Sequence, residues 1–246
     1  NATYSILQNI IDGTIGNYMA DGEDKAAKLR VDSAIGLNEF YSDRNGKEEL
    51  VSTKRNEGGF VHTTTTLIDD EKQRNTFKCD MIITNVTHVD ADEEHNIPEK
   101  VIVKGAIFDF RKSLLPVEFT ATNPGAMAYY EGLGASPSEP VFTKLWGRQV
   151  SEVIKREIRE ESAFGDDNVR EVQSTRKDFV ITGGAKEPYV WDDESSITAK
   201  ELTEAMAARE TYLATLKQRQ DEYKASKQNA TTATTVVPTA TEGFKF

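Results

Sequence analysis

Aromatic and basic side chains alternate in two segments near the middle of the chain, residues 104–112 and 144–148. In an extended strand, residues two positions apart point to the same side, so each segment would place rings and cations on one face. This combination binds single-stranded nucleic acid, because aromatic rings stack on bases and cations contact phosphates. We therefore predict a nucleic-acid-binding site made of Lys104, Phe108, Phe110, Arg111, Lys112, Lys144, Trp146 and Arg148.

In this site the rings of Phe108, Phe110 and Trp146 would stack on bases, and the five cations would meet phosphates. A second role stays open for the rings, since aromatic residues in barrel strands usually belong to the core, and Trp146 could equally anchor a barrel wall. Alanine at positions 108 and 110 would separate the two roles. Weaker oligonucleotide binding without unfolding would favour stacking, and loss of the fold would make the rings core.

No catalytic motif competes with this binding site. Residues 132–136 (Gly-Leu-Gly-Ala-Ser) lack the Lys-Ser/Thr ending of a phosphate-binding loop, and the chain has no Gly-x-Ser-x-Gly elbow. Asp109 and Glu118 flank the loop at 112–115 and could form a metal-nuclease pair, although carboxylates at strand edges or in loops are the simpler interpretation. We expect no catalysis, with a metal-dependent nuclease as the weakest hypothesis.

Metal and redox chemistry find little support in the sequence. The three histidines, His62, His88 and His95, are scattered and lack a metal-ligand spacing. Cys79 is the only cysteine, which excludes a disulfide within the chain and a zinc site of clustered cysteines. We therefore expect neither a cofactor nor a bound metal.

The distribution of charge along the chain is more informative than its sum. The 246 residues carry a formal net charge of −11, but residues 95–186 hold 13 Lys plus Arg against 13 Asp plus Glu. A net acidic protein is not a general binder of polyanions, because phosphate contacts dominate that affinity. A basic groove on an acidic body is compatible with these numbers, and its binding would depend steeply on salt.

The middle of the chain predicts a small β-barrel. We expect strands over residues 76–89, 100–111, 114–122 and 141–146, with Gly105 marking a bulge or a tight bend. Residues 126–133 are expected to form a short helix, residues 169–172 and 178–182 further strands, and the highly charged residues 150–161 could be helical. Many short strands with turn signals, followed by a helix, are typical of a barrel with appendages.

The N-terminal part carries weaker signals. Residues 1–27 are interpreted as an arm or a short helix that ends near Gly13. Residues 29–41 predict two short strands or one bulged strand, and residues 43–46 (Asp-Arg-Asn-Gly) a turn before a returning strand at 49–53. Gly58-Gly59 predicts a second break, before a strand over residues 60–68 in which four threonines favour extended structure.

The C-terminal part predicts a linker, a long helix and a flexible tail. A capping box, Thr198-Ala-Lys-Glu201, opens a helix expected to run to about Lys227. The tail from residue 228 is rich in Thr and Ala and ends with Phe244 and Phe246; we expect it to be mobile until bound. The apolar seam of the helix, which could pack on the barrel or pair with another chain, comprises Leu202, Met206, Leu213, Leu216 and Tyr223.

Three sequence strings resemble a known class of proteins. They are residues 130–147 (Tyr-Glu-Gly-Leu-Gly-Ala-Ser-Pro-Ser-Glu-Pro-Val-Phe-Thr-Lys-Leu-Trp-Gly), 160–165 (Glu-Glu-Ser-Ala-Phe-Gly) and 189–193 (Tyr-Val-Trp-Asp-Asp). Together they resemble single-stranded-DNA-binding proteins of phage and prophage replication modules, over about residues 75–225. The resemblance implies an OB-fold barrel that coats single strands exposed in replication or recombination, with a helical C-terminal extension, but it transfers no defined set of residues.

Two features depart from better-known single-strand binders. No run of acidic residues precedes the last phenylalanine, which puts recruitment of partners through an acidic tip in doubt, and the N-terminal third is unfamiliar. No hydrophobic run approaches the ~18 residues that a membrane span needs, and no signal peptide is visible. We therefore expect a cytoplasmic protein, in the host cell cytoplasm if it is phage-encoded, without a membrane partner.

The sequence thus predicts a mainly β protein with four parts. Residues 28–185 would form an OB-like barrel with insertions, after the arm of residues 1–27. A linker and helix over residues 186–227 and the tail of residues 228–246 would follow. The expected function is non-sequence-specific binding of single-stranded DNA in phage replication or recombination. Replication or recombination proteins and further copies of the chain are candidate partners. The alternative is a virion component or adaptor that assembles through the C-terminal helix and tail.

Overall fold

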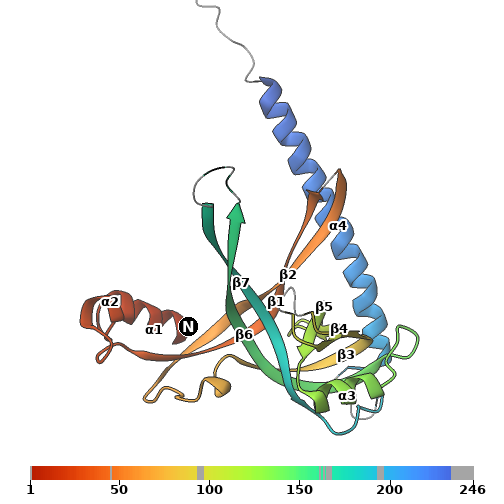
Figure 1. Cartoon of the computed structure of the whole chain (residues 1–246), viewed down its shortest axis with the longest axis horizontal. Coiled ribbons are helices and arrows are strands. Elements are labelled where there is room, and N and C mark those ends of the chain that lie inside the picture. The colour runs from red at the N-terminus through yellow and green to blue at the C-terminus, as the bar shows by residue number, and fades with distance from the viewer. Residues whose placement is uncertain are drawn as a thin grey trace, which may run out of the picture.

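The structure is a computed structural model, and it describes residues 2–44, 46–92, 97–160, 162, 164, 168–192 and 197–233. Its elements, in chain order, are α1 (Ala2–Ile11), α2 (Tyr18–Asp21), β1 (Lys28–Arg44), β2 (Lys47–Thr64), the 3-10 turn η1 (Glu71–Gln73), β3 (Thr76–Val89), β4 (Lys100–Phe108), β5 (Leu114–Ala121), α3 (Pro124–Gly132), β6 (Val141–Glu160), β7 (Asn168–Gly184) and α4 (Ala199–Ala233). Figure 1 shows their arrangement.

Five strands close into a barrel in the order β3-β4-β5-β7-β6. All neighbours pair antiparallel except β5 and β7, which are parallel and meet only at Thr120 and Val180. With α3 between the third and fourth strands, this is an OB-like small barrel, and the predicted fold class of a mainly β protein with a long C-terminal helix is confirmed. The predicted strand at 76–89 is confirmed, as is the irregularity at Gly105, which lies opposite the register shift between Ile83 and Asn85.

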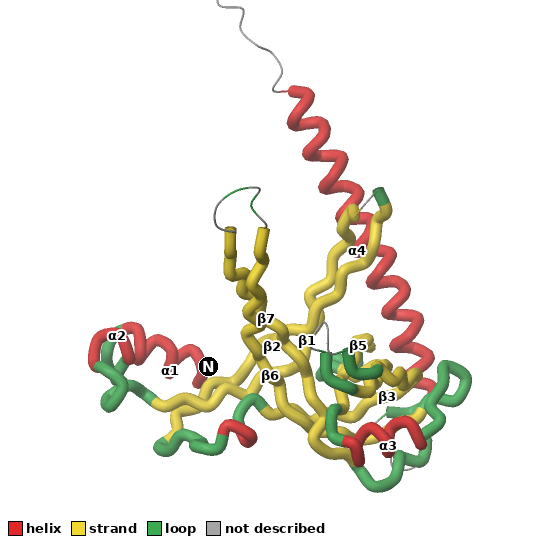
Figure 2. The backbone as a smooth tube through the Cα atoms, viewed as in Figure 1, coloured by secondary structure: helices red, strands yellow, loops and turns green. Residues whose placement is uncertain are grey.

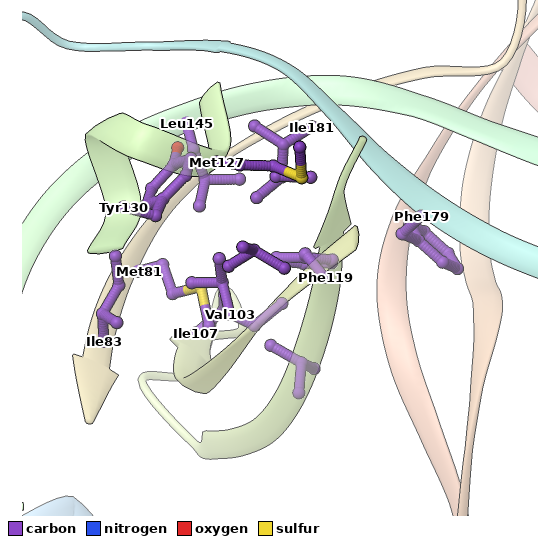
Figure 3. Close-up of a cluster of buried hydrophobic side chains, with 13 residues drawn as sticks. Met81, Ile83, Val103, Ile107, Phe119, Met127, Tyr130, Leu145, Phe179 and Ile181 are labelled. Carbon is purple, nitrogen blue, oxygen red and sulfur yellow. The ribbon is translucent and has the colours of Figure 1, made fainter. Parts of the chain in front are cut away.

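The barrel core is apolar and continuous because the inward positions of its strands alternate with outward ones. Met81 and Ile83 of β3, Val101 and Val103 of β4, and Phe119 of β5 are buried, as the period of two requires. Figure 3 shows this cluster with Met127 and Tyr130 of α3 at one end and Phe179 of β7 at the other. Helix α3 therefore covers one end of the barrel.

The ribbon formed by β1 and β2 lies against the opposite end of the core. Ile35 and Leu37 of β1 pack on the core cluster. Lys54 of β2 reaches the gap where β5 and β7 separate: its ammonium donates a hydrogen bond to the Glu118 carbonyl and lies 5.7 Å and 5.2 Å from the ring centres of Phe119 and Phe179. Burial lowers the pKa of Lys54. The N-terminal ribbon is thus part of the barrel's closure.

The ribbon is longer and more regular than the sequence predicts. Strand β1 is a single strand whose pairing with β2 shifts register between Asp32 and Ala34, and the predicted break at Gly58-Gly59 is wrong, because β2 runs through it. The two glycines have φ of 63° and 140° and supply the extra residue of the bulge. Positive φ is available to glycine at low cost, so a pair of glycines can bend a strand without ending it.

Strands β6 and β7 extend beyond the barrel as a two-stranded arm (Figure 1). The helix considered for residues 150–161 is wrong, because β6 continues from Val141 to Glu160, and the two strands predicted in 169–182 are one, β7. The register pairs Ser151 with Lys177 and continues to Glu160 and Asn168. High charge alone does not separate an exposed strand from an exposed helix, since both carry polar residues on solvated faces.

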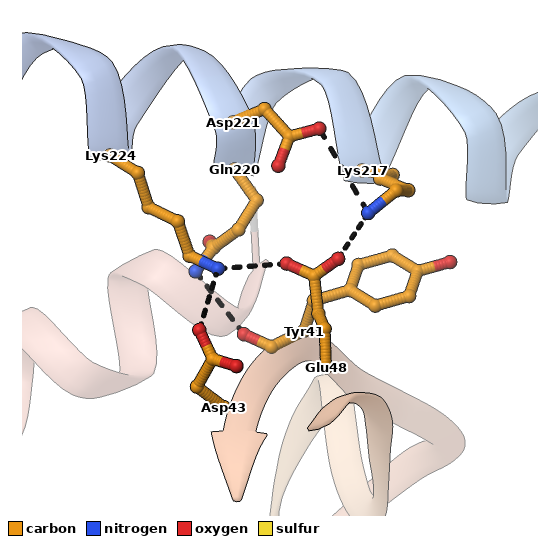
Figure 4. A network of polar contacts seen from close by, with 7 residues as sticks. All are labelled: Tyr41, Asp43, Glu48, Lys217, Gln220, Asp221 and Lys224. Atoms are coloured by element: carbon orange, nitrogen blue, oxygen red, sulfur yellow. Dashed lines mark hydrogen bonds and ion pairs between the residues drawn. The ribbon is translucent and has the colours of Figure 1, made fainter. Parts of the chain in front are cut away.

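Helix α4 lies along the tip of the β1–β2 ribbon, held mainly by ion pairs (Figures 1 and 4). Arg209 forms an ion pair with Glu39 through two hydrogen bonds. The side chain of Arg209 is only 12% exposed and that of Glu39 only 2%. Nearer the tip, Lys217 and Lys224 both contact Glu48. A charged interface of this kind fixes the helix in one position, because each buried charge needs its partner.

The predicted seam and end of α4 need correction. Leu202, Leu213 and Leu216 are half-buried, but Met206 and Tyr223 of the expected seam are 53% and 56% exposed, since the ribbon covers a different face. The helix also runs to Ala233 instead of Lys227. The rest of the predicted flexible tail, including Phe244 and Phe246, lies outside the described residues. None of the described helices is long and apolar enough to cross a membrane.

The backbone path as a whole is drawn in Figure 2. Helices α1 and α2 lie at the end of the ribbon opposite α4, and Thr3 of α1 accepts a hydrogen bond from the Val61 backbone at 3.1 Å. The short helix expected in the N-terminal arm is therefore present. The barrel carries three projections, namely the two ends of the ribbon and the β6–β7 arm.

Candidate nucleic-acid interface

The outer face of β6 carries an exposed tryptophan beside cations. Trp146 is 41% exposed, and its indole lies over Gly183 of β7, where no side chain competes for the space. Lys78 of β3 pairs directly with Trp146 in the sheet register, so its side chain stands on the same face. Arg148 pairs with Thr76 in the same unbroken register with β3, so it follows Trp146 by two positions on that face. We call this region the Trp146 surface, and it consists of Arg74, Lys78, Trp146, Arg148 and Lys186.

Among the described residues, the cations of the Trp146 surface have no acidic partners. Within the described part of the chain, neither Lys78, Arg148 nor Lys186 forms an ion pair, and Arg74 donates only to the Ile68 carbonyl. Three lysines of the predicted site differ, because Lys104, Lys112 and Lys144 each pair with a carboxylate. Unpaired cations beside an exposed ring keep their full attraction for an anion, because binding does not first require breaking an ion pair.

A pocket of about 640 Å³ opens beside this surface, where β5 and β7 part below their single contact. Arg148 lies on its rim and also lines a second hollow of about 280 Å³, to which Arg74 contributes. The larger pocket is bounded by the start of α3, the end of β7 and two tyrosines. Its lining residues are Thr122, Asn123, Ala126, Tyr129, Tyr130, Arg148, Val180, Ile181, Thr182, Gly183, Gly184, Ala185 and Lys186.

Two of the residues predicted from sequence, Trp146 and Arg148, therefore lie together beside a pocket. The signal that found them was the alternation of ring and cation along one strand. Arg74, Lys78 and Lys186 were missed. The pairing of β3 with β6 brings Lys78 opposite Trp146, whereas Arg74 and Lys186 border the two hollows that Arg148 lines.

Phe108 and Lys144 lie under the linker that leads to α4. Phe108 packs against a second apolar cluster made of Ile82, Phe142 and Ile197. The ammonium of Lys144 lies 3.9 Å from the Asp80 carboxylate and 5.6 Å from the ring centre of Tyr189. The hydroxyl of Tyr189 and then Asp80 raise the pKa of Lys144. Both residues hold the linker on the barrel, and we leave them out of the Trp146 surface.

Lys104 and Lys112 are engaged with carboxylates. Lys104 lies 3.8 Å from Glu118 across the β4–β5 pair. Lys112, at φ 62°, pairs with Glu201 in the first turn of α4, and this contact, with the Thr198 groups, lowers the pKa of Glu201 to about 2. OB barrels commonly bind oligonucleotides on the face of their second and third strands. Here that face, β4 and β5, presents an ion pair.

Phe110 and Arg111 stand on the turn between β4 and β5. Phe110 is 84% exposed, and the Arg111 guanidinium lies 5.0 Å from its ring centre. Asp109 organises the turn by accepting hydrogen bonds from the backbone of Arg111 and Ser113. An exposed ring stacked with a guanidinium can meet a base and a phosphate, so this turn is a second candidate contact point.

The two carboxylates of the nuclease hypothesis have structural roles. Asp109 caps the turn at residues 109–113, and Glu118 pairs with Lys104. Among the described residues, no group of three or more His, Cys, Asp or Glu side chains is placed to hold a metal ion. The described structure therefore gives no support to the nuclease hypothesis.

Comparison with known proteins identifies the family. The chain matches the family described as YorF over residues 14–235, which is most of its length. It belongs to the YorF family. The match extends from the N-terminal ribbon through the barrel to α4. No curated protein and no solved structure matches the chain.

Proposed function

We propose that this YorF-family protein binds single-stranded DNA without sequence specificity, through the Trp146 surface, and performs no catalysis. The observation that carries the proposal is the exposed indole of Trp146 beside the unpaired guanidinium of Arg148. The ring can stack on any base, with a contribution of roughly 1–3 kcal/mol per base. The cations around it can follow the phosphates of a flexible strand.

The OB-like topology supports this placement. Besides the second and third strands, OB barrels use the loop between their fourth and fifth strands for oligonucleotides. In this chain those strands are β6 and β7, and the β6–β7 arm replaces a short loop. A strand crossing the Trp146 surface would lie on the barrel wall at the base of this arm. The resemblance to phage and prophage replication proteins favours a role in phage DNA replication or recombination.

The acidic character of the whole chain is compatible with this proposal. The net charge of −11 disfavours loose attraction of any polyanion. A few unpaired cations gathered on one face can still bind a strand at low salt. The proposal therefore includes strong salt dependence and weak binding of duplex DNA, whose paired bases do not offer their faces to Trp146.

The proposal is tested by tryptophan fluorescence, since the chain contains only Trp146 and Trp191. In Trp191→Phe, Trp146 is the single reporter, and oligo-dT should quench its emission by stacking. Trp146→Phe is the matched control. Its remaining tryptophan, Trp191, is stacked on Phe142 with 5.2 Å between ring centres, so its emission should not respond to oligo-dT. No quenching of Trp146 by oligo-dT, at protein and DNA concentrations well above micromolar, would contradict the proposal.

A role in assembly is the second candidate, and exposed tyrosines on α4 favour it. Tyr212 and Tyr223 are 46% and 56% exposed, and their spacing puts them on one face of the helix. A cation lies over each ring, Arg209 at 5.3 Å and Lys227 at 4.9 Å. Light scattering of the full chain and of Tyr212→Glu/Tyr223→Glu tests this role, which requires an oligomer that the double variant loses.

A further inference from the structure

The pocket beside Arg148 contains a buried hydroxyl group without a partner. Tyr130 is only 2% exposed, and its hydroxyl makes no hydrogen bond in the described part of the chain. The neighbouring Tyr129 differs, since its hydroxyl donates to the Ala185 carbonyl at 3.0 Å. A buried hydroxyl without a partner costs roughly 1–3 kcal/mol, and such a group needs an explanation.

The position of this hydroxyl points to a ligand. Tyr130 lines the pocket, and a Cβ placed on Gly184 would come 3.1 Å from its hydroxyl oxygen. The Gly183-Gly184 pair therefore leaves the wall of the pocket open next to the unsatisfied group. A larger side chain at position 184 would crowd the hydroxyl, whose oxygen is itself closed off from solvent in the unbound chain.

The rest of the pocket has two chemically different parts. Its inner wall is apolar and aromatic, formed by Ala126 and the two tyrosines, whose rings meet edge to face at 5.1 Å. Its rim is cationic, with Arg148 and Lys186. The start of α3 also opens here, where Asn123 accepts a hydrogen bond from the Gly125 backbone, and a helix N-terminus favours anions.

We propose that this pocket holds one nucleotide of the bound strand, with its base against the tyrosine wall and its phosphate at Arg148 and Lys186. A small shift of the Tyr130 ring on binding then brings its hydroxyl, which is closed off from solvent in the unbound chain, into a hydrogen bond with the base and supplies the partner that it lacks. The volume of about 640 Å³ lies within the range of small-molecule sites. This inference rests on the proposed function, since the pocket adjoins the Trp146 surface through Gly183 and Arg148.

The inference is tested with two pocket variants and one control, titrated with thymidine 5′-monophosphate by calorimetry. Thr182→Phe places a ring in the pocket from an exposed position on β7 and should abolish binding. Tyr130→Phe removes only the hydroxyl and should weaken binding roughly 2- to 10-fold. Its melting temperature should stay level or rise, because the unsatisfied group is gone. Thr175→Phe, exposed on the same strand within the arm, is the matched control and should bind like the parent chain.

The nature of the ligand is resolved by two further probes. Inorganic phosphate alone should bind more weakly than the nucleotide, because only the cationic rim recognises it. Thymidine should also bind more weakly, because it lacks the phosphate. Equal affinity for phosphate and nucleotide would contradict a site for the base and overturn the inference.

The outcomes separate this inference from the proposed function. If the nucleotide does not bind and Thr182→Phe binds oligo-dT like the parent chain, the pocket inference fails and the proposed function stands. If the nucleotide binds but oligo-dT does not, the pocket is a nucleotide site and single-strand binding fails. Loss of both in Thr182→Phe, with both kept in Thr175→Phe, supports the pocket as part of the strand-binding surface.

Discussion

The indole of Trp146 lies so close to Gly183 that a methyl group at position 183 would stand 2.4 Å from the indole nitrogen. Glycine on β7 therefore sets the position of the ring on β6. The same glycine lines the neighbouring pocket, which links the stacking ring to the nucleotide site. The position of Trp146 thus depends on a residue that has no side chain.

Gly183→Ala should move the indole without removing it. The contact distance is shorter than real Cβ contacts allow, and the ring is the mobile partner, so it must rotate outward. We expect weaker oligo-dT binding, roughly 10-fold, which approaches the effect of Trp146→Ala. Anisotropy of a labelled oligo-dT measures the affinity. Gly183→Ala combined with Trp146→Ala should bind oligo-dT no more weakly than Trp146→Ala alone. If the losses of affinity from the two substitutions add, Gly183 acts on something other than the ring.

The ion pair between Arg209 and Glu39 should dominate the attachment of α4. Arg209→Met leaves the Glu39 carboxylate, 2% exposed, without its partner and should lower the free energy of unfolding by about 3–5 kcal/mol. Arg209→Met combined with Glu39→Leu should recover most of this loss, because no buried charge remains. Urea denaturation followed by circular dichroism gives these values.

Lys224→Met is the matched comparison on the same helix. Lys224 is 37% exposed and pairs with Asp43 and Glu48, so its removal should lower the free energy of unfolding far less than Arg209→Met does. Equal losses for Arg209→Met and Lys224→Met would show that the buried pair has no special weight in holding α4.

His88 should make stability depend on pH. It lies 2.7 Å from Glu131 of α3, 3.2 Å from Glu99 and 3.5 Å from Asp90, and the Glu131 contact is the main cause that raises its pKa above the usual value of about 6.5. A raised pKa means that the folded state binds the proton more tightly than the unfolded state. The stabilisation is therefore complete below about pH 6.5 and is lost as the pH rises through the folded-state value.

His88→Gln isolates this contribution. The difference in urea midpoint between the parent chain and His88→Gln should be larger at about pH 6 than at about pH 8.5. Other groups titrate equally in both chains, so they cancel from the difference. A difference that does not change with pH would contradict a stabilising role for protonated His88.

The barrel could be predicted from sequence because its strands carry local signals. Apolar residues alternate with polar ones in much of β3 and are concentrated in β5. Gly105 marks the point where the backbone of β4 comes close to the Ile82 carbonyl of β3. The β6–β7 arm could not, since residues 150–161 are charged and lack the apolar face that would identify a strand. The contact of Lys54 with the barrel also has no local signal, because the Glu118 carbonyl that accepts its hydrogen bond is 64 residues away.

The candidate site was predictable only in part for the same reason. Whether a cation is free depends on which acids fold next to it: Lys112 finds its partner Glu201 at a separation of 89 residues. Arg148 finds none in the described chain. Sequence alternation identified Trp146 and Arg148 but could not show that Lys104, Lys112 and Lys144 are paired, nor that Lys78 and Lys186 join the surface.

The most direct test of the account is fluorescence anisotropy of a labelled oligo-dT at two salt concentrations, with the parent chain, Arg148→Gln and Lys104→Gln. The parent chain should bind oligo-dT in a salt-sensitive way and spare duplex DNA. Arg148→Gln should bind more weakly and reduce the salt slope by about 0.7, the value for one phosphate contact on a single strand. Lys104→Gln, already paired with Glu118, should change neither. No oligo-dT binding at low salt, or equal effects of the two variants, would contradict the account.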